Sequence, residues 1–481
     1  MAGYSLAITT LNTRWLSREL IYHHFPNRDN LARAISALQQ IPFKIRTSGS
    51  LLPSLIVLPQ NERYWKRLGV AARRTRQWSI PVAMHVAWVL VAFVFAVVDS
   101  FVDFNHFLAI PGGAVYSIAA AWAYLLPVVI GWLHVGSQPE AHYLRAALDD
   151  AHDLAYVATT TEPILATHIG HRITRAIESS TMHIDHVNHD EGKTAPIFNY
   201  ARVFIWSQNA EYILQLYSHA AGRAEQRIPV HGGIWEIPGD PIAPKNLIGN
   251  EAEVVHYCTP VGGGVPKFDP FSHTKYVPTA HPTKDDEENT EATIPVKSIF
   301  ATGVFHRIAV AAILALCLQW GTTGASILIL ILTPPKGLGC HAFTFIIYGS
   351  AATISFFLLF FSSILAHWTR PQTAWRRRSL SNTFAGPAAA LTRWMGKTIA
   401  ILNGLGLLIT CIMQFGGTFD NCFCSSTIFG GDPDGLIKFV GPDIKKGEVY
   451  GSWIGGMVMA FGVGVLYSFA IYLTMSPIES S

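Results

Sequence analysis

Five histidines near the middle of the chain have the residue type and the spacing to bind a metal ion. They are His168, His171, His183, His186 and His189, and the last three recur every third residue in HIDHVNHD. Imidazole and carboxylate groups are good ligands for zinc and similar ions. On a helix, however, each three-residue step turns by about 300°, so the last three histidines spread over about 120°. A polar, solvated helix end accounts for the stretch equally well, so we expect no metal and no other cofactor.

Cys258 and His256, in the stretch VVHYCTP, have the residue types of a nucleophile and its general base. Two residues apart on a strand they would face one side, but the sequence supplies no third group to orient the base. The GKT at 192–194 is no phosphate loop, because Val187 stands where that loop requires glycine. We therefore expect a protein that is not an enzyme. A metal-dependent membrane enzyme that uses the histidines remains an alternative.

Three of the six cysteines stand in two polar stretches that follow long apolar segments. Cys340 lies in PPKGLGCH, and Cys422 and Cys424 lie in FDNCFCSS. If both stretches emerge on the same oxidising side of a membrane, short loops can bring two Cα atoms within the roughly 4.4–6.8 Å that a disulfide needs. We predict a bond from Cys340 to Cys422 or Cys424, with one cysteine left over. Three unlinked thiols are the alternative.

The elements that position these groups are mostly apolar. Hydrophobic residues make up 50% of the 481 residues and charged residues only 14%, whereas a soluble protein carries about a quarter charged residues. Spanning a bilayer takes about 20 helical residues. Six segments are long and apolar enough: 80–100, 113–135, 305–333, 342–367, 396–416 and 452–474. This predicts an all-α integral membrane protein with six transmembrane helices, as a two-helix hairpin within 79–135 and a four-helix region within 303–475. The third segment is overlong and is expected to tilt, or to break at GTTG (321–324).

Lysine and arginine near the spans predict the orientation, because cytosolic loops are enriched in both. Basic residues are frequent before the first span and between the fourth and fifth, whereas 101–112 has none and 334–341 has only Lys336. We expect both termini in the cytosol, with cytosolic segments 1–78, 136–302 and 476–481 and an outer loop at 417–451. The host would be the plasma membrane or a membrane of the secretory pathway.

The insert at 136–302 is acidic, with 12 basic and 21 acidic residues, while the whole chain carries a net charge of +3. We expect helices up to about residue 226, at 139–159, 162–179 and 199–226, and irregular, partly disordered chain after it. The segment 1–78 contains one plausible amphipathic helix, DNLARAISALQQ. The expected partners are the lipid bilayer and a protein bound through the insert, with no nucleic acid.

The predicted spans carry no Asp, Glu, Lys or Arg in their central parts. Proton relays and ion-coupled carriers normally place charge there, so ion-coupled transport is disfavoured. The polar residues at depth are milder, and each more often bridges helices than binds substrate: Gln319, Thr322, Thr323, Asn403 and Gln414. A water-filled cavity lined by Gln319, Thr322 and Asn403 would favour a transporter or channel built on the last four spans.

Small residues recur every four positions in the last two spans, which lets helix backbones approach closely. The rows are Gly396, Ala400 and Gly404; Gly451 and Gly455; and Gly456, Ala460 and Gly464. They predict helix packing, either within one chain or between two copies in a homo-oligomer.

The strings LQWGTTGASILILILTPPKGLGCHAFTFIIYG and QFGGTFDNCFCSS, and more loosely TAPIFNYARVFIWSQ, resemble a group of uncharacterised fungal multi-pass membrane proteins. That resemblance implies a source but no activity. The leading expectation for function is a non-enzymatic structural or interaction component of a membrane, with the insert as the partner surface.

Overall fold

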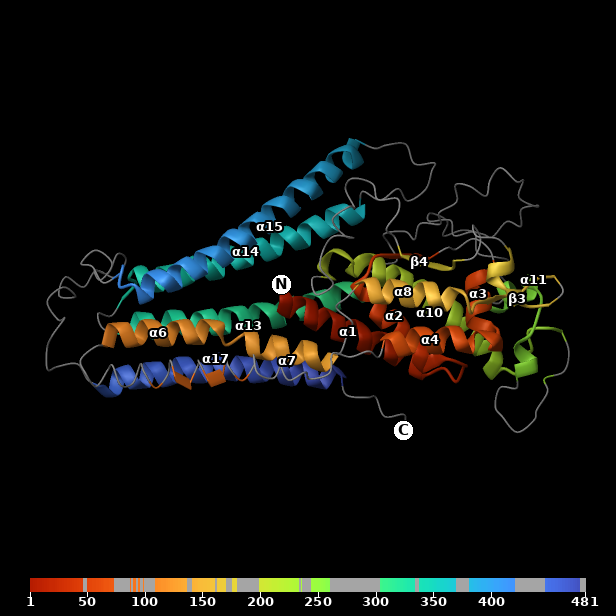
Figure 1. The fold of residues 1–481 in the computed structure, drawn as a ribbon, viewed down its shortest axis with the longest axis horizontal. Helices are drawn as coiled ribbons and strands as arrows, with labels where there is room; N and C mark the ends of the chain where they lie inside the picture. The colour runs from red at the N-terminus through yellow and green to blue at the C-terminus, as the bar shows by residue number, and fades with distance from the viewer. Residues whose placement is uncertain are drawn as a thin grey trace.

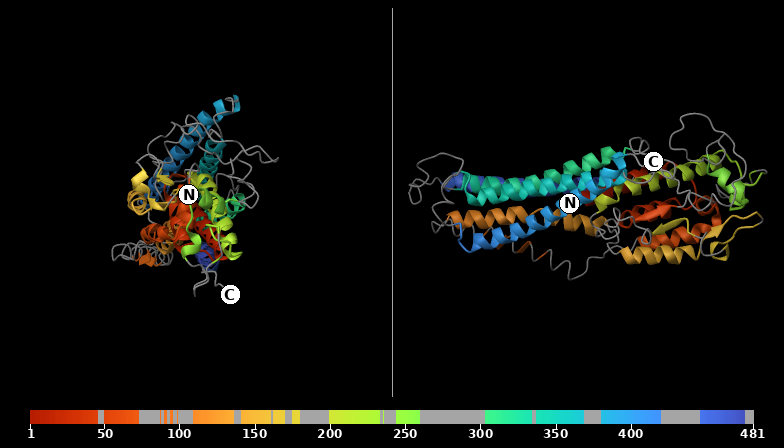
Figure 2. Two further views of the ribbon diagram at one scale, coloured as in Figure 1. Left: turned by 90° about the vertical axis from the view of Figure 1, so that its right-hand side faces the viewer. Right: turned by 90° about the horizontal axis from the view of Figure 1, so that it is seen from above.

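A computed structural model describes most of the chain outside its long loops. The described residues are 1–45, 50–72, 109–135, 141–160, 162–169, 175–179, 199–232, 235, 244–259, 303–333, 337–368, 380–419 and 446–475, with isolated positions between 87 and 98. The described residues are mostly helical, at 81%. It is elongated, with long helices at one end and shorter elements at the other (Figure 1). Figure 2 shows the same division from above.

The long helices form a bundle. They are α6 (Ala109–Trp122), α7 (Leu125–Val135), α13 (Val304–Leu332), α14 (Cys340–Trp368), α15 (Leu380–Phe415) and α17 (Lys446–Met475). Five stretches are long and apolar enough to cross a membrane: Tyr116–Leu133, Val304–Leu332, Cys340–His367, Phe384–Gln414 and Tyr450–Met475. These helices indicate an all-α membrane protein. The sixth predicted span, 80–100, lies mostly outside the described residues.

One alternative left open for the spans is excluded, and one predicted boundary is wrong. α13 runs without a break through GTTG, where Gly321 packs against Val463. α15 begins at Leu380, well before residue 396, and continues through Arg393 and Lys397. The helix continues past Arg393 because that side chain is buried against α14, where its Nε donates to Ser362 Oγ at 3.2 Å.

The shorter elements form what we call the soluble module. From the N-terminal segment come α2 (Arg28–Ala37), η1 (Leu38–Gln40), β1 (Phe43–Ile45), α3 (Leu51–Val57), η2 (Pro59–Asn61) and α4 (Glu62–Ala72). From the insert come α8 (Ala141–His152), β2 (Tyr156–Val157), β3 (Ile164–Leu165), η3 (Ala166–Ile169), β4 (Ile177–Ser179), η4 (Asn199–Ala201), α10 (Val203–Glu225), η5 (Pro244–Leu247) and α11 (Glu251–Tyr257). Both segments contribute to one apolar core, which includes Trp65 and Tyr217.

The insert folds together with the N-terminal segment because their strands pair. β1 and β4 are antiparallel, with Phe43 opposite Ser179 and Ile45 opposite Ile177. The prediction of a helix over 162–179 is wrong, since this stretch forms β3, η3 and β4 where the chain is described. Its pairing partner β1 lies more than a hundred residues away, and local periodicity does not register such a partner. The helix predicted at 199–226 is confirmed by α10.

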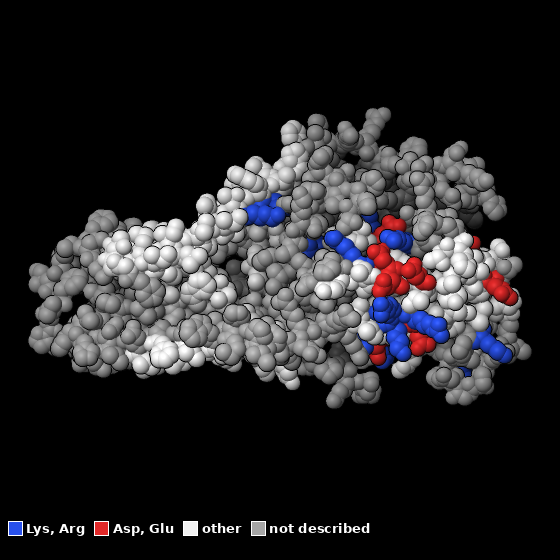
Figure 3. All heavy atoms as spheres, in the orientation of Figure 1, with Lys and Arg blue, Asp and Glu red and all other residues white. Residues whose placement is uncertain are grey.

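Charged side chains gather over the soluble module, as Figure 3 shows for one face. Two ion pairs there join separate elements. Arg67 Nη2 on α4 lies 2.7 Å from Asp150 Oδ2 on α8, and Arg175 Nη1 lies 3.1 Å from Asp149 Oδ1. Each partner is half exposed or more, so solvent screens these pairs and each contributes below about 1 kcal/mol.

His152 is buried at the end of α8 and holds β4 in place. Its Nε2 lies 2.8 Å from the carbonyl oxygen of Ile177. A carbonyl can only accept, so Nε2 carries the proton and Nδ1 has the lone pair in the neutral ring. Nδ1 is buried with no hydrogen-bond partner among the described residues. Burial lowers the pKa of His152, and Arg175 also lowers it, while the bond to Ile177 and two nearby aspartates act in the opposite direction.

Acidification should therefore destabilise the soluble module. The pKa of His152 is lower in the folded chain than its ordinary value of 6.5, so below that pH the unfolded chain binds the proton first. The contribution of neutral His152 is complete above pH 6.5, and each unit below it costs up to about 1.4 kcal/mol until the folded pKa is reached. Unfolding temperatures of the wild type and His152→Gln between pH 7.5 and 5.5 measure this loss. In His152→Gln the unfolding temperature should depend less steeply on pH than in the wild type. His168→Gln, at an exposed site, should leave this pH dependence unchanged. Equal slopes in all three proteins would contradict the assignment.

One helix links the two ends of the molecule. α1 (Ala2–Ile21) starts in the middle of the molecule, among the bundle helices, and runs into the soluble module (Figure 1). Its first half buries Tyr4 and Leu6 in a core shared with α13, α14 and α17, and its second half buries Leu16 and Leu20 in the module core. The sequence predicted only one helix in 1–78, at 29–40. That helix is α2 with η1, whereas α1 was not predicted.

Candidate functional site

The candidate site is a buried polar network where α1, η1, η4 and α13 meet, which we call the junction. Asn12, on α1, is its centre. Its Nδ2 donates to Gln39 Oε1 at 3.0 Å, and its Oδ1 accepts from Arg307 Nε at 2.8 Å. Asn12, Gln39 and Arg307 are 0%, 2% and 6% exposed, so the network is shielded from water.

Gln39 ties the end of α2 to α1 and to the insert. Its Nε2 lies 3.1 Å from the carbonyl oxygen of Ser36 and 3.3 Å from Thr13 Oγ1. The backbone carbonyl oxygen of Gln39 accepts a hydrogen bond from Arg202 Nε at 3.4 Å. Buried amides need such partners, because an unpaired buried polar group costs about 1–3 kcal/mol. The bonds therefore fix three separate chain segments against one another.

Thr9 extends the network into the insert. Its Oγ1 donates to the carbonyl oxygen of Ser5 at 2.7 Å and accepts from Asn199 Nδ2 at 2.8 Å. Asn199 belongs to η4, which leads into α10, and the start of α10 packs in the bundle core through Phe204. α10 thus also contacts both cores, because Trp206 lies in the core of the soluble module.

Arg307 is held on a second side by aromatic rings. Its guanidinium carbon lies 4.3 Å from the Trp15 ring centroid, a cation–π geometry. Trp15 meets Trp206 edge to face at 6.3 Å, and Trp206 Nε1 donates to the carbonyl oxygen of Ile35 at 2.8 Å. The first turn of α13 is therefore clamped between α1 and the module core.

Two carboxylates place negative charge near this guanidinium. Burial raises the pKa of Glu211 on α10; the neighbouring charge of Glu19 raises it further, while Gln215 and Arg307 lower it. Glu19 and Glu211 both attract Arg307. The groups that make the junction's hydrogen bonds are amides, hydroxyls and a guanidinium, which suit holding elements together better than acid, base or nucleophilic chemistry.

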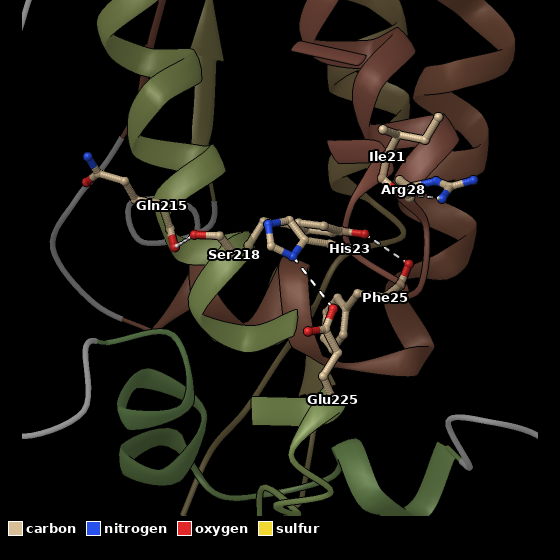
Figure 4. A network of polar contacts seen from close by, with 8 residues as sticks. Ile21, His23, Phe25, Arg28, Gln215, Ser218 and Glu225 are labelled. Carbon is tan, nitrogen blue, oxygen red and sulfur yellow. Dashed lines mark hydrogen bonds and ion pairs between the residues drawn. The ribbon is translucent and has the colours of Figure 1, made fainter. Parts of the chain in front are cut away.

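A second contact anchors the far end of α1 to the end of α10. Tyr217 Oη donates to the carbonyl oxygen of Phe25 at 2.9 Å, and His23 Nδ1 lies 3.7 Å from Glu225 Oε1. Figure 4 shows His23 and Glu225 facing each other across this turn, and Arg28 reaching back to Ile21. The Arg28 Nη1 atom donates to the carbonyl oxygen of Ile21 at 3.4 Å. α1 is thus fixed along its whole length.

Of the predicted metal-binding histidines, the structure describes only His168, which is exposed in η3. His171, His183, His186 and His189 lie outside the described residues. Across the described part of the chain, no three His, Cys, Asp or Glu side chains gather as a metal site would require.

Cys258 and His256 do not form a nucleophile–base pair. They lie at the end of the helix α11, where His256 is exposed and Cys258 is buried. Burial raises the pKa of the Cys258 thiol, while Arg223 acts in the opposite direction. A raised pKa disfavours the reactive thiolate. Arg223 instead donates to the carbonyl oxygen of His256.

The polar residues of the spans mostly bond within and between helices. Gln319 Nε2 donates to Thr323 Oγ1 at 2.9 Å, Thr322 Oγ1 donates to the carbonyl oxygen of Leu318 at 3.0 Å, and Asn403 Nδ2 on α15 donates to the carbonyl oxygen of Tyr348 on α14 at 3.0 Å. Gln414 is buried at the end of α15, with no hydrogen-bond partner among the described residues.

A small cavity, partly open to its surroundings, lies at the middle of the bundle. It measures ≈ 70 Å³ and is lined by α1, α7, α13 and α14. Of the predicted lining residues, only Gln319 reaches it, since Thr322 and Asn403 do not line it. Sites for drug-sized ligands measure about 300–1,000 Å³, so this cavity has room for water rather than for such a ligand.

The predicted small-residue rows divide into packed and open positions. A Cβ at Gly396 would lie 2.8 Å from Leu359, one at Gly456 would lie 2.5 Å from Ile329, and one at Gly464 would lie 3.7 Å from Pro127. Ala460 is buried as well. Ala400 is exposed, and added Cβ atoms at Gly404, Gly451 and Gly455 would meet nothing within 4 Å among the described residues.

The cysteines differ in state. Cys258, Cys317 and Cys411 are free thiols, whereas Cys340 is disulfide-bonded. Cys422 and Cys424 lie outside the described residues, so the predicted pairing with one of them stays a prediction.

Sequence reasoning missed the junction altogether. The one signal in the sequence is that no charged side chain precedes Arg14, which favours a buried helix. The hydroxyl and amide side chains before Arg14 favour a solvated segment instead.

In comparisons with known proteins, no family model, no curated protein and no solved structure matches this chain.

Proposed function

We propose that this protein is a non-enzymatic interaction component of a membrane, whose bundle holds the soluble module as one body for a protein partner. The observation that carries this proposal is the junction. α1 is buried in both cores, and Arg307 at the start of a span is held by Asn12 and Trp15. A module on a flexible linker would not need such a contact.

Disturbing the junction tests the proposal. Arg307→Gln should change the size of the native complexes extracted from the membrane, because the soluble module would no longer be held in one position relative to the bundle. Arg67→Gln, which removes an exposed ion pair of the module, should leave them intact. Unchanged complexes in the Arg307 variant, or protein-dependent solute flux in reconstituted vesicles, would contradict the proposal.

A transporter or channel built on the last four spans is the second candidate. The observation that favours it is the cavity at the middle of the bundle, with the polar side chains of Gln319 on α13 and Thr353 on α14 on its lining, although α15 and α17 do not line it. A metal-dependent enzyme is the third, and it rests only on the sequence pattern of the histidines. A homo-oligomer through the open glycine positions of α15 and α17 would be compatible with each candidate.

We infer six spans, with the C-terminus and the soluble module in the cytosol of a plasma-membrane or secretory-pathway protein. The sequence places the N-terminus in the cytosol as well, but Met1 starts among the bundle helices. The arginine and lysine content of the loops supports this orientation. Tags at the C-terminus and near residue 285 should both be cleaved by protease added to the cytosolic side of sealed vesicles. Protection of the tag near residue 285 would contradict six spans.

We further infer that the disulfide of Cys340 joins it to Cys422 or Cys424 on the outer side of the membrane. Peptide mapping of non-reduced, alkylated protein should recover Cys340 cross-linked to a peptide from 417–451. Recovery of alkylated Cys422 and Cys424 together would refute this pairing.

A further inference from the structure

The start of α1 lies at the middle depth of the spans. The cavity that Gly3 lines is also lined by Leu318, Thr353 and Tyr124. These three residues occupy the centres of the candidate spans Val304–Leu332, Cys340–His367 and Tyr116–Leu133. A bilayer that covers these spans therefore places the start of α1 near its midplane.

The other end of this segment leaves the bundle where the spans end. Arg307, which bonds to Asn12, is in the first turn of α13, and Arg14 donates to the carbonyl oxygen of Leu473 in the last turn of α17. From Gly3 to Asn12 the helix rises about 14 Å, which is about half of the roughly 30 Å hydrocarbon thickness. The length of this segment and its contacts at both ends therefore both indicate a helix that crosses half of the membrane.

The sequence of this segment suits that position. Residues 1–13 carry no Asp, Glu, Lys or Arg, and the polar side chains among them are satisfied largely inside the protein, as Thr9, Thr10 and Thr13 are by backbone carbonyls. Backbone and hydroxyl groups at membrane depth are tolerated where they are buried in protein. The first charged side chain, Arg14, comes where α1 reaches the membrane surface.

Close contacts hold this segment among the spans. Tyr467 Oη on α17 donates to the carbonyl oxygen of Gly3 at 2.6 Å. A Cβ on Gly131 of α7 would lie 2.4 Å from Leu6 Cδ2, so the missing side chain makes room for α1. Tyr4 meets Phe356 of α14 edge to face at 5.3 Å.

We propose that the first three turns of α1 are a membrane-embedded plug that closes the bundle from the side of the soluble module. The plug separates the cavity beside Gln319 and Thr353 from water on that side. The Arg307–Asn12 bond and the Tyr467–Gly3 bond are its latch. Because the rest of α1 belongs to the module core, displacement of the module would displace the plug. The proposal does not depend on the proposed function, since a sealed scaffold and a gated pathway both need such a closure.

Thiol accessibility tests the plug. Ala352→Cys places a probe on the cavity lining, in a background where Cys317 and Cys411 are alanine. A charged, water-soluble thiosulfonate is added from the module side, and modification is read at residue 352 by peptide mass spectrometry. With the latch intact the probe should react slowly. With Arg307→Gln and Tyr467→Phe combined, it should react at least tenfold faster.

A reversible lock then isolates α1 as the cause. Leu6→Cys with Gly131→Cys, joined by oxidation in the unlatched chain, should return the probe to the slow rate. Prior reduction should restore the fast rate. Ile313→Cys, on the outside of α13 and 61% exposed, should stay slow in every variant if it faces lipid, and Tyr22→Cys on the module, 71% exposed, should stay fast.

Two results would overturn the plug. Either the unlatched chain reacts no faster than the latched chain, or the fast reaction persists when the lock is closed. If Arg307→Gln prevents folding, Tyr467→Phe alone removes only one hydrogen bond and should still raise the rate, and closing the lock should still cancel the rise.

Discussion

Arg307→Ala should lower the free energy of unfolding by about 3 kcal/mol, because this buried side chain, 6% exposed, holds the junction together. A hydrogen bond to a charged group contributes about 1.5–3 kcal/mol and a shielded cation–π contact about 2 kcal/mol, and losing Arg307 also leaves Asn12 Oδ1 buried without its donor. Thermal unfolding in nanodiscs, followed by tryptophan fluorescence, measures the loss, since Trp15 and Trp206 report on the junction itself.

Two companion variants make this result specific. Arg307→Lys keeps the positive charge near Glu211 but loses the planar group that stacks on Trp15, so we expect partial recovery. Arg67→Ala removes an arginine from an exposed ion pair, and its effect should stay below about 1 kcal/mol. Equal losses for Arg307→Ala and Arg67→Ala would mean that the junction contributes nothing beyond ordinary surface charge.

Gly456→Val should destabilise the bundle by about 3 kcal/mol, because α17 and α13 approach too closely for a side chain there. A Cβ at Gly456 would lie 2.5 Å from Ile329 Cγ1 and 3.3 Å from the carbonyl oxygen of Ala325. Overpacking of a dense interface costs about 1–3 kcal/mol, and the backbone on one side leaves little room to adjust. The measurement is the detergent concentration or temperature at which the purified protein loses its monodisperse peak.

The neighbouring glycine is the matched control. Gly455 lies on the same helix, and a Cβ there would meet nothing within 4 Å among the described residues. Gly455→Val should therefore change stability by less than about 1 kcal/mol. If both valines disturbed the protein equally, helix propensity rather than the α13–α17 contact would be the cause.

The spans could be predicted because the hydrocarbon thickness imposes a length on any apolar helix that crosses it. Four of the six predicted segments differ by only a few residues from candidate spans of the structure. The candidate span that matches the fifth predicted segment begins earlier than predicted, because the basic residues before residue 396, Arg393 among them, were assigned to a loop. Arg393 is buried against Ser362, and a charge does not end a helix when a neighbouring helix supplies its partner.

The junction could not be predicted, because its residues form their hydrogen bonds with partners that are distant in the sequence. Asn12 bonds with Gln39 and with Arg307, which is 295 residues away. Read locally, the asparagine and threonines of α1 indicate a solvated segment. The pairing of β4 with β1 could not be predicted for the same reason. Patterns with a period of two or 3.6 report on the face that a residue shares with its neighbours, not on contacts across the fold.

The length of α15 sets a preference for its lipid surroundings. Its candidate span, Phe384–Gln414, contains 31 residues, with Arg393 and Lys397 among them, and so rises about 46 Å, against about 30 Å of hydrocarbon in a typical bilayer. Such a mismatch is relieved by tilting the helix or by thickening the bilayer around it, at a cost that grows with each ångström. Among the described residues, α15 packs chiefly with α14, so few of the described neighbours fix its tilt. The tilt of the α14–α15 hairpin should therefore change with bilayer thickness, and we expect the protein to accumulate where lipids are longer and more ordered.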